Sequence, residues 1–110
     1  YFSAVVTEPL DSALKARVRA VLDRRPVTES ELRKLIEEGE ACARILDARL
    51  ARIEARMSDL SADPESSLAE IAAVMREANE LRPDVAELHA LLTALEGLAR
   101  EFRATWMSAH

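Results

Sequence analysis

The sequence has little glycine and few aromatic residues. Two glycines and four prolines occur in 110 residues, and aromatic residues make up 4% of the chain. Valines and isoleucines are few and never alternate with polar residues over a useful length, as they would in half-buried strands. This composition argues against a β-rich fold.

Residues for common kinds of catalysis are also missing. Cys42 is the only cysteine, so an internal disulfide and a zinc site of cysteines are both excluded. The sequence has no glycine-rich phosphate loop, Gly-x-Ser-x-Gly turn, His-Glu-x-x-His or Cys-x-x-Cys. Helical di-iron sites need Glu-x-x-His pairs, but Ala86 stands three residues before His89. We therefore expect no enzyme activity, no cofactor and no metal, and we expect His89 to be structural or at the surface.

The charge balance disfavours two classes of partner. Fifteen basic residues stand against twenty acidic ones, giving a net charge of -5, whereas a duplex-binding domain normally has a basic excess. No apolar run approaches the roughly 20 residues that span a membrane. The sequence "YFSAVV" at the N-terminus does not match a signal peptide. We expect a cytoplasmic protein that binds neither nucleic acid nor membranes, and its arginine and alanine content favours a bacterial origin.

Alanine, leucine, glutamate and arginine dominate instead, a composition typical of long helices. Proline is tolerated in the first turn of a helix but disrupts its interior, so we place breaks at Pro26, Pro64 and Pro83. Between these breaks, apolar residues recur every three or four positions. The expected helices cover residues 8–24, 29–60, 64–81 and 83–107.

Local signals support some of these boundaries. Thr28 and Glu31 have the spacing of a capping box at the start of the second helix. Asp63 followed by Pro64 has the pattern of a cap and a first helical residue for the third helix. Gly39 lies on the apolar stripe of the second helix, where it would permit close crossing by another helix.

The predicted fold is all-α, an antiparallel bundle of four helices with one long central helix. Residues 1–7 are expected to form an extended N-terminal arm, and residues 8–110 a single helical-bundle domain. Short connections make consecutive helices antiparallel neighbours. The second helix is nearly twice as long as the first and third. Either these two cover different stretches of it, or its far end projects and needs a partner.

The last expected helix has two contrasting sides. One is a broad leucine-rich stripe that includes Phe102 and Trp106, both expected to lie in the core. The opposite side carries small residues, among them Ala90 and Gly97. Alanine is the best helix former and needs no contact to justify it, but a glycine inside a helix costs about 1 kcal/mol against alanine. This side is either a solvated surface or a close contact within or between chains.

Charges are separated along the second helix. Its first half carries the glutamates Glu29, Glu31, Glu37, Glu38 and Glu40. Its second half is rich in arginine, with Arg49, Arg52 and Arg56 near an off-stripe isoleucine, Ile45. The helix dipole explains such an order only at the ends. Two antiparallel copies about a two-fold axis near Ala43 would pair acidic with basic halves. The alternative is a solvated charged face.

These patterns favour a non-enzymatic protein-protein interaction or assembly module, self-associating as a possible homodimer, with a small-molecule ligand disfavoured. The expected contact residues are Ile45, Arg49, Arg52, Arg56, Ala90 and Gly97. One alternative is a helical chaperone or secretion partner, which would need an exposed apolar groove. Another is a ligand-sensing or dimerization domain of a bacterial regulator. The ligand-sensing form would need an enclosed pocket near His89 and Trp106.

Overall fold

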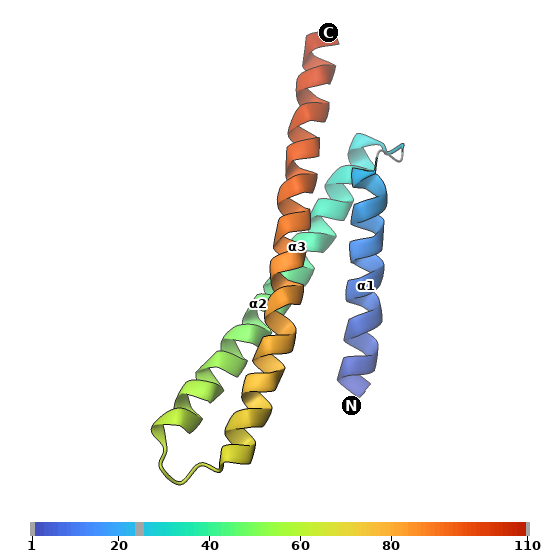
Figure 1. Cartoon of the computed structure of the whole chain (residues 1–110). Helices are drawn as coiled ribbons and strands as arrows, with labels where there is room; N and C mark the ends of the chain where they lie inside the picture. Colours follow the sequence, from blue (N-terminus) through green and yellow to red (C-terminus); the bar gives the residue numbers. More distant parts are fainter. Residues whose placement is uncertain (1, 24–25, 110) are drawn as a thin grey trace.

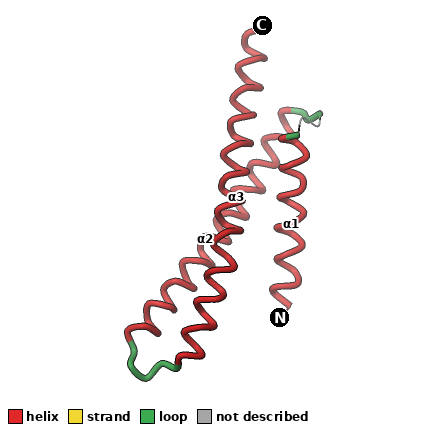
Figure 2. Tube along the Cα trace, in the orientation of Figure 1, coloured by secondary structure: helices red, strands yellow, loops and turns green. Residues whose placement is uncertain are grey.

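Three long helices make up the fold (Figure 1). The computed structural model describes the backbone of residues 2–23 and 26–109 and the side chains of residues 12–23 and 26–108. Within these residues there is no strand, and short loops join the helices (Figure 2). The helices are α1 (Phe2–Leu22), α2 (Glu29–Ala62) and α3 (Leu68–Ala109). They form an elongated molecule of 67 × 25 × 18 Å in which α2 runs antiparallel to both α1 and α3.

The all-α prediction is confirmed, but the predicted count of four helices is wrong. Residues expected to form two helices on either side of Pro83 belong to one helix, α3. Proline removes one hydrogen bond of the helix and crowds the preceding turn. Here Pro83 is exposed, whereas Leu81 and Val85 beside it are 9% and 8% exposed in the core. Packing of the same apolar stripe before and after the proline therefore outweighs its local cost.

Two other boundaries also differ from the prediction. Helix α1 begins at Phe2, so residues 2–7, expected as an extended arm, are helical. The turn after α2 is longer than expected, and Asp63 caps the end of α2 instead of the start of α3. The Asp63 carboxylate accepts a hydrogen bond from the Glu65 amide at 2.9 Å. Ser67 takes the expected capping role, because its hydroxyl accepts from the Glu70 amide at 3.1 Å.

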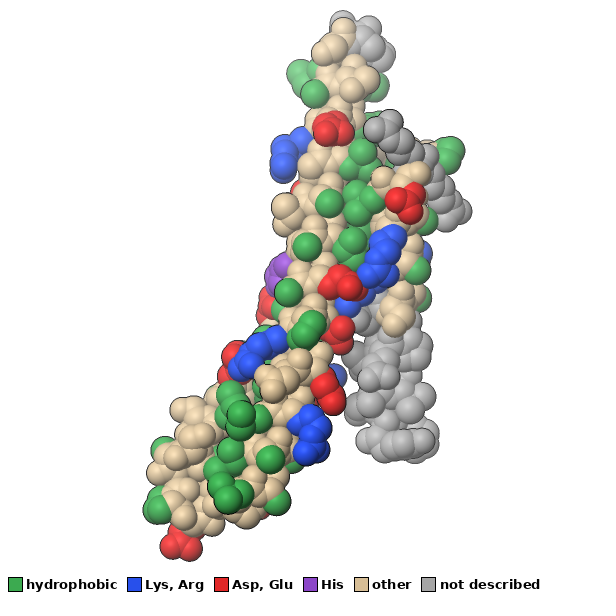
Figure 3. Space-filling model, in the orientation of Figure 1, with side chains coloured by type: hydrophobic (Ala, Val, Ile, Leu, Met, Phe, Trp, Pro, Cys, Tyr) green, Lys and Arg blue, Asp and Glu red, His purple; other side chains and the backbone are tan. Residues whose placement is uncertain are grey.

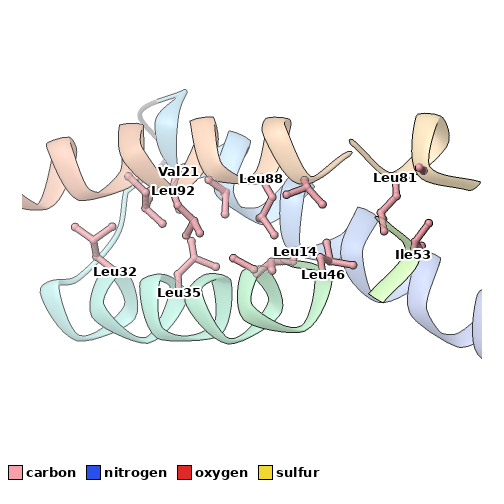
Figure 4. Close-up of a cluster of buried hydrophobic side chains, with 14 of the residues drawn as sticks. Leu14, Val21, Leu32, Leu35, Leu46, Ile53, Leu81, Leu88 and Leu92 are labelled. Atoms are coloured by element: carbon pink, nitrogen blue, oxygen red, sulfur yellow. The ribbon is translucent and has the colours of Figure 1, made fainter. Parts of the chain in front are cut away.

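The core is a continuous row of apolar side chains between α2 and α3, extended by α1 along part of their length. Side chains of α2 and α3 point toward one another in this row (Figure 4). The largest of those with essentially no exposure are Leu32 of α2, Val18 of α1, and Leu88 and Leu95 of α3. Toward the turn between α2 and α3, the described part of this row includes Ile53 of α2 and Leu81 of α3 (Figure 4).

Gly39 lets α2 and α3 approach closely, as the sequence indicates. A Cβ atom added at Gly39 would collide with the Leu92 side chain of α3. Leu92 is 5% exposed and forms part of the core. The glycine therefore fills a specific packing role that offsets its low helix propensity.

The capping box at the start of α2 is confirmed. The Thr28 hydroxyl accepts from the Glu31 amide at 3.1 Å, and the Glu31 carboxylate accepts from the Thr28 amide at 3.4 Å. Replacing Thr28 with alanine removes the acceptor for a first-turn amide, so we expect a loss of about 1 kcal/mol in unfolding free energy. Chemical denaturation followed by circular dichroism measures this loss. Thr28→Ser keeps the hydroxyl and should be close to wild type, and a Thr28→Ser loss as large as that of Thr28→Ala would contradict the capping role.

Candidate protein-interaction surfaces

The outward side of α2 is the first candidate surface. Most of its residues are three or four positions apart, and they lie on the side of the helix away from the core residues Leu35, Leu46 and Ile53. Ile45 lies near its middle and is 64% exposed, the one exposed large apolar side chain among the described residues of α2. We call this surface the Ile45 face. It comprises Glu31, Lys34, Glu37, Glu38, Ala41, Ile45, Ala48, Arg49, Arg52, Arg56 and Asp59.

Ion pairs within the chain involve only part of this face. Glu38 accepts a hydrogen bond from Arg17 of α1 at 2.7 Å. Arg49 is half-buried and lies 3.9 Å from Glu77 of α3, at the outer limit of an ion pair. Arg52 and Arg56 are exposed, and neither forms an ion pair within the part of the chain that the structure describes. The basic half of the face therefore keeps most of its charge available at the surface.

Ala90 and Gly97 lie elsewhere, on α3. Ala90 is exposed and Gly97 half-buried. A Cβ atom added at Gly97 would meet only the Arg100 guanidinium, at 3.8 Å. The close contact considered for this small-residue side is therefore not made within the described part of the chain. Ala90 and Gly97 are therefore on a different helix from the four predicted contact residues of α2, and Gly97 lines a groove beside the end of α1.

The C-terminal end of α3 is a third surface, and here the sequence-based prediction is wrong. Phe102 and Trp106, expected in the core, are 38% and 59% exposed, and Met107 is 72% exposed. The cause is the length of the neighbouring helices. A depression that includes Phe102 also includes Glu29, the first residue of α2. The turns of α3 after Phe102 extend beyond the start of α2, as the projecting C-terminal end in Figure 1 shows. Their apolar residues continue the stripe of α3 there.

Shallow grooves flank Phe102 on both sides of α3. One lies between α2 and α3 and is lined by Leu32, Ile36 and Ala99 among charged residues. The other lies beside the end of α1, and hydrophobic side chains are visible between α1 and the upper part of α3 in Figure 3. It is lined by Val21, Leu22, Pro26, Val27, Ala94, Gly97, Leu98, Glu101 and Phe102, so the predicted contact residue Gly97 borders this groove. The sequence did not indicate these grooves, because they depend on how three helix ends align.

His89 contacts Asp47 at the surface of the molecule. Its Nε2 atom lies 2.9 and 3.1 Å from the carboxylate oxygens of Asp47 on α2, and both side chains are about half exposed. Trp106 is seventeen residues further along α3, about 25 Å at 1.5 Å per residue. The depression beside His89 is lined by Glu40, Arg44 and Thr93 and does not reach Trp106. The enclosed pocket near both residues, which a ligand sensor would need, is absent from the described part of the chain.

A buried lysine joins α1 to α3, and no sequence signal marked it. Lys15 is 5% exposed, between the core residues Leu14 and Val18. Its ammonium lies 3.2 Å from a carboxylate oxygen of Glu87. Arg19 also donates to Glu87, at 2.6 Å. The hydrogen bond and charge of Lys15, followed by those of Arg19, hold the pKa of Glu87 below its usual value of 4.5.

This cluster predicts an acid-sensitive contribution to stability. Because the folded pKa of Glu87 is lower than its unfolded pKa, the contribution is present above about pH 4.5 and is lost as the pH falls through the folded pKa. The melting temperature of Glu87→Gln should therefore be lower than that of wild type at pH 7. The gap should narrow steadily in melts at successively lower pH below 4.5. A gap that stays constant down to pH 3 would contradict this role of the Glu87 charge.

Metal and membrane sites are not found in the described part of the chain. Among its residues, no group of three or more histidine, cysteine or acidic side chains is placed to hold a metal ion. Within the same ranges, no helix is both long and apolar enough to cross a membrane. Comparison with known proteins assigns no relationship, since no family model, curated protein or solved structure matches the chain.

Proposed function

We propose that the protein is a non-enzymatic protein-protein interaction module that self-associates through its helix surfaces. The observation that carries this proposal is the Ile45 face, where Ile45 is 64% exposed between acidic and basic parts of α2. An exposed large apolar side chain flanked by charges has the composition of an interface centre with a polar rim. Most residues of this face are exposed, whereas Glu38 contacts Arg17 of α1 and Ala41 and Arg49 are half-buried.

The proposal is tested by measuring molar mass over a range of concentrations. Size-exclusion chromatography with light scattering should give a mass that rises with concentration toward twice the 12.2 kDa of one chain. Association by burial of a modest helix face is expected to be reversible, so the mass should fall on dilution. A constant mass of one chain at every concentration, up to the millimolar range, would reject self-association.

The exposed end of α3 favours a second candidate function. A helical chaperone or secretion partner that shields an apolar segment of another protein needs an exposed apolar groove, and two grooves flank Phe102. Trp106 and Met107 extend the apolar surface beyond them. Contiguous exposed apolar residues of this kind commonly mark sites of protein contact.

This second candidate makes a separate experimental prediction. The protein should slow the aggregation of a model protein whose disulfides have been reduced, and the double variant Phe102→Gln/Trp106→Gln should lose that effect. Ile45→Gln is the matched control, since it removes an exposed apolar side chain from α2. Equal protection by the wild type, the double variant and Ile45→Gln would show that the end of α3 is not responsible.

The dimerization domain of a bacterial regulator, the other candidate function, would also self-associate through helix surfaces.

A further inference from the structure

We infer that the partner on the Ile45 face is a second copy of this chain, docked with the two α2 helices antiparallel and a two-fold axis beside Ile45. This inference rests on the proposed self-association and specifies its geometry. The sequence alone placed the axis near Ala43. Ala43 is 4% exposed and packed in the core, so its side chain is not available to another chain. Ile45 is the large exposed apolar residue closest to it along α2.

The residues around Ile45 allow two helices to approach closely. Ala41 is half-buried and Ala48 exposed, one turn before and about one turn after Ile45 on the same face. Small side chains there leave room for the isoleucine of the second copy, and the axis brings the two Ile45 side chains together. A two-fold interface of this kind is closed and self-complementary, so it yields a dimer instead of a fibre.

The charges on either side of Ile45 are complementary under this symmetry. The half of the face before Ile45 carries three glutamates and one lysine, Glu31, Lys34, Glu37 and Glu38. The half after it carries three arginines and one aspartate, Arg49, Arg52, Arg56 and Asp59. In the antiparallel arrangement each net acidic half faces the net basic half of the other copy. In a parallel arrangement like halves would face each other, so the charges select the antiparallel one.

One opposite-charge contact follows directly from the register. Glu38 and Arg52 are equally far from Ile45 in sequence, so the axis sets Arg52 of one copy opposite Glu38 of the other, twice per dimer. The same register sets Arg56 opposite Lys34 and Asp59 opposite Glu31, and these like-charge pairs reduce the net attraction between the two halves. Arg52 forms no ion pair within the described part of its own chain. Glu38 already accepts from Arg17, and its carboxylate has a second oxygen that can accept from an arginine of the partner.

Cysteine cross-linking tests the position of the axis. In a full-length Cys42→Ala background, Ile45→Cys should form a covalent dimer under mild oxidation, because the two thiols meet at the axis. Ala90→Cys is the matched control, an exposed position on the outward side of α3, and should remain largely monomeric. If light scattering shows a dimer but Ala90→Cys cross-links as well as or better than Ile45→Cys, this geometry is rejected and self-association is retained. A monomer at all concentrations would reject both.

Charge reversal gives a second measurement that does not alter Ile45. Arg52→Glu places like charges across the axis at two positions, and we expect the dimer dissociation constant to rise at least about tenfold, since each close like-charge contact disfavours the pair. Arg76→Glu makes the same change in net charge at an exposed position on α3 and should leave the constant within about twofold. Sedimentation equilibrium measures both constants. Equal effects of the two variants would overturn the assigned register.

Discussion

Replacing Leu88 with alanine should lower the unfolding free energy by about 2–5 kcal/mol, the largest single-residue effect that we expect in this fold. Leu88 has no exposed surface and lies in the middle of α3, in the row of side chains that faces α2 (Figure 4). Truncation there removes apolar contacts and leaves a cavity between two long packed helices. Urea denaturation of the two proteins measures the difference.

The matched control is Leu68→Ala at the start of the same helix. Leu68 is 83% exposed, so the same chemical change should alter stability by no more than about 0.5 kcal/mol. Equal losses at the two positions would mean that the row between α2 and α3 is not the core of the molecule in solution.

The two glycines should respond in opposite directions to the same substitution. Gly39→Ala forces a methyl group against Leu92 of α3, and overpacking of this kind should outweigh the gain in helix propensity, with a net loss of about 1–2 kcal/mol. Gly97→Ala adds a methyl group where the nearest neighbour is Arg100 at 3.8 Å. It should raise stability by up to about 1 kcal/mol. Thermal and chemical denaturation of both variants measure the two signs.

The glycine pair also distinguishes two interpretations of the small-residue side of α3. If Gly97 were held against a second chain, alanine would weaken association even while it favoured the helix. We expect the dimer dissociation constant of Gly97→Ala to equal that of the wild type, because the inferred interface lies on α2. Loss of stability at Gly97, or weaker association, would move the interface to α3.

The sequence predicted the fold where local and periodic signals agreed. The all-α class follows from composition and spacing, and the capping box at Thr28 follows from four consecutive residues. Gly39 could also be recognised as a crossing point, because a glycine on an apolar stripe weakens the helix unless another helix packs closely against it. In each case the information is contained in a short segment or in a single helix face.

Other features depend on tertiary contacts that no local pattern contains. Pro83 has the local signature of a helix break, but the helix continues because residues on both sides of it pack against α2. Lys15 is buried because acidic residues of α3, Asp84 and Glu87, lie beside it. Phe102 has perfect core spacing and is nevertheless partly exposed, since α2 begins at about its level.

The same distinction applies to the candidate surfaces. Ile45 could be assigned to the outside of α2 from spacing alone, and its 64% exposure agrees with that assignment. Spacing alone could not place the symmetry axis, because Ala43 and Ile45 are only two positions apart and packing against α3 decides which of them is buried. The grooves beside Phe102 were missed for the same reason.

In the inferred dimer, oppositely charged halves of α2 hold two chains together, and the salt dependence of the dimer tests this arrangement most directly. Exposed charges are screened over about 10 Å at 0.1 M salt and about 3 Å at 1 M. Light scattering at a fixed concentration should therefore show the dimer fraction falling as salt is raised from about 0.05 to 0.5 M. A dimer whose stability is unchanged or increased by salt would contradict the claim and point to an interface of apolar and small residues.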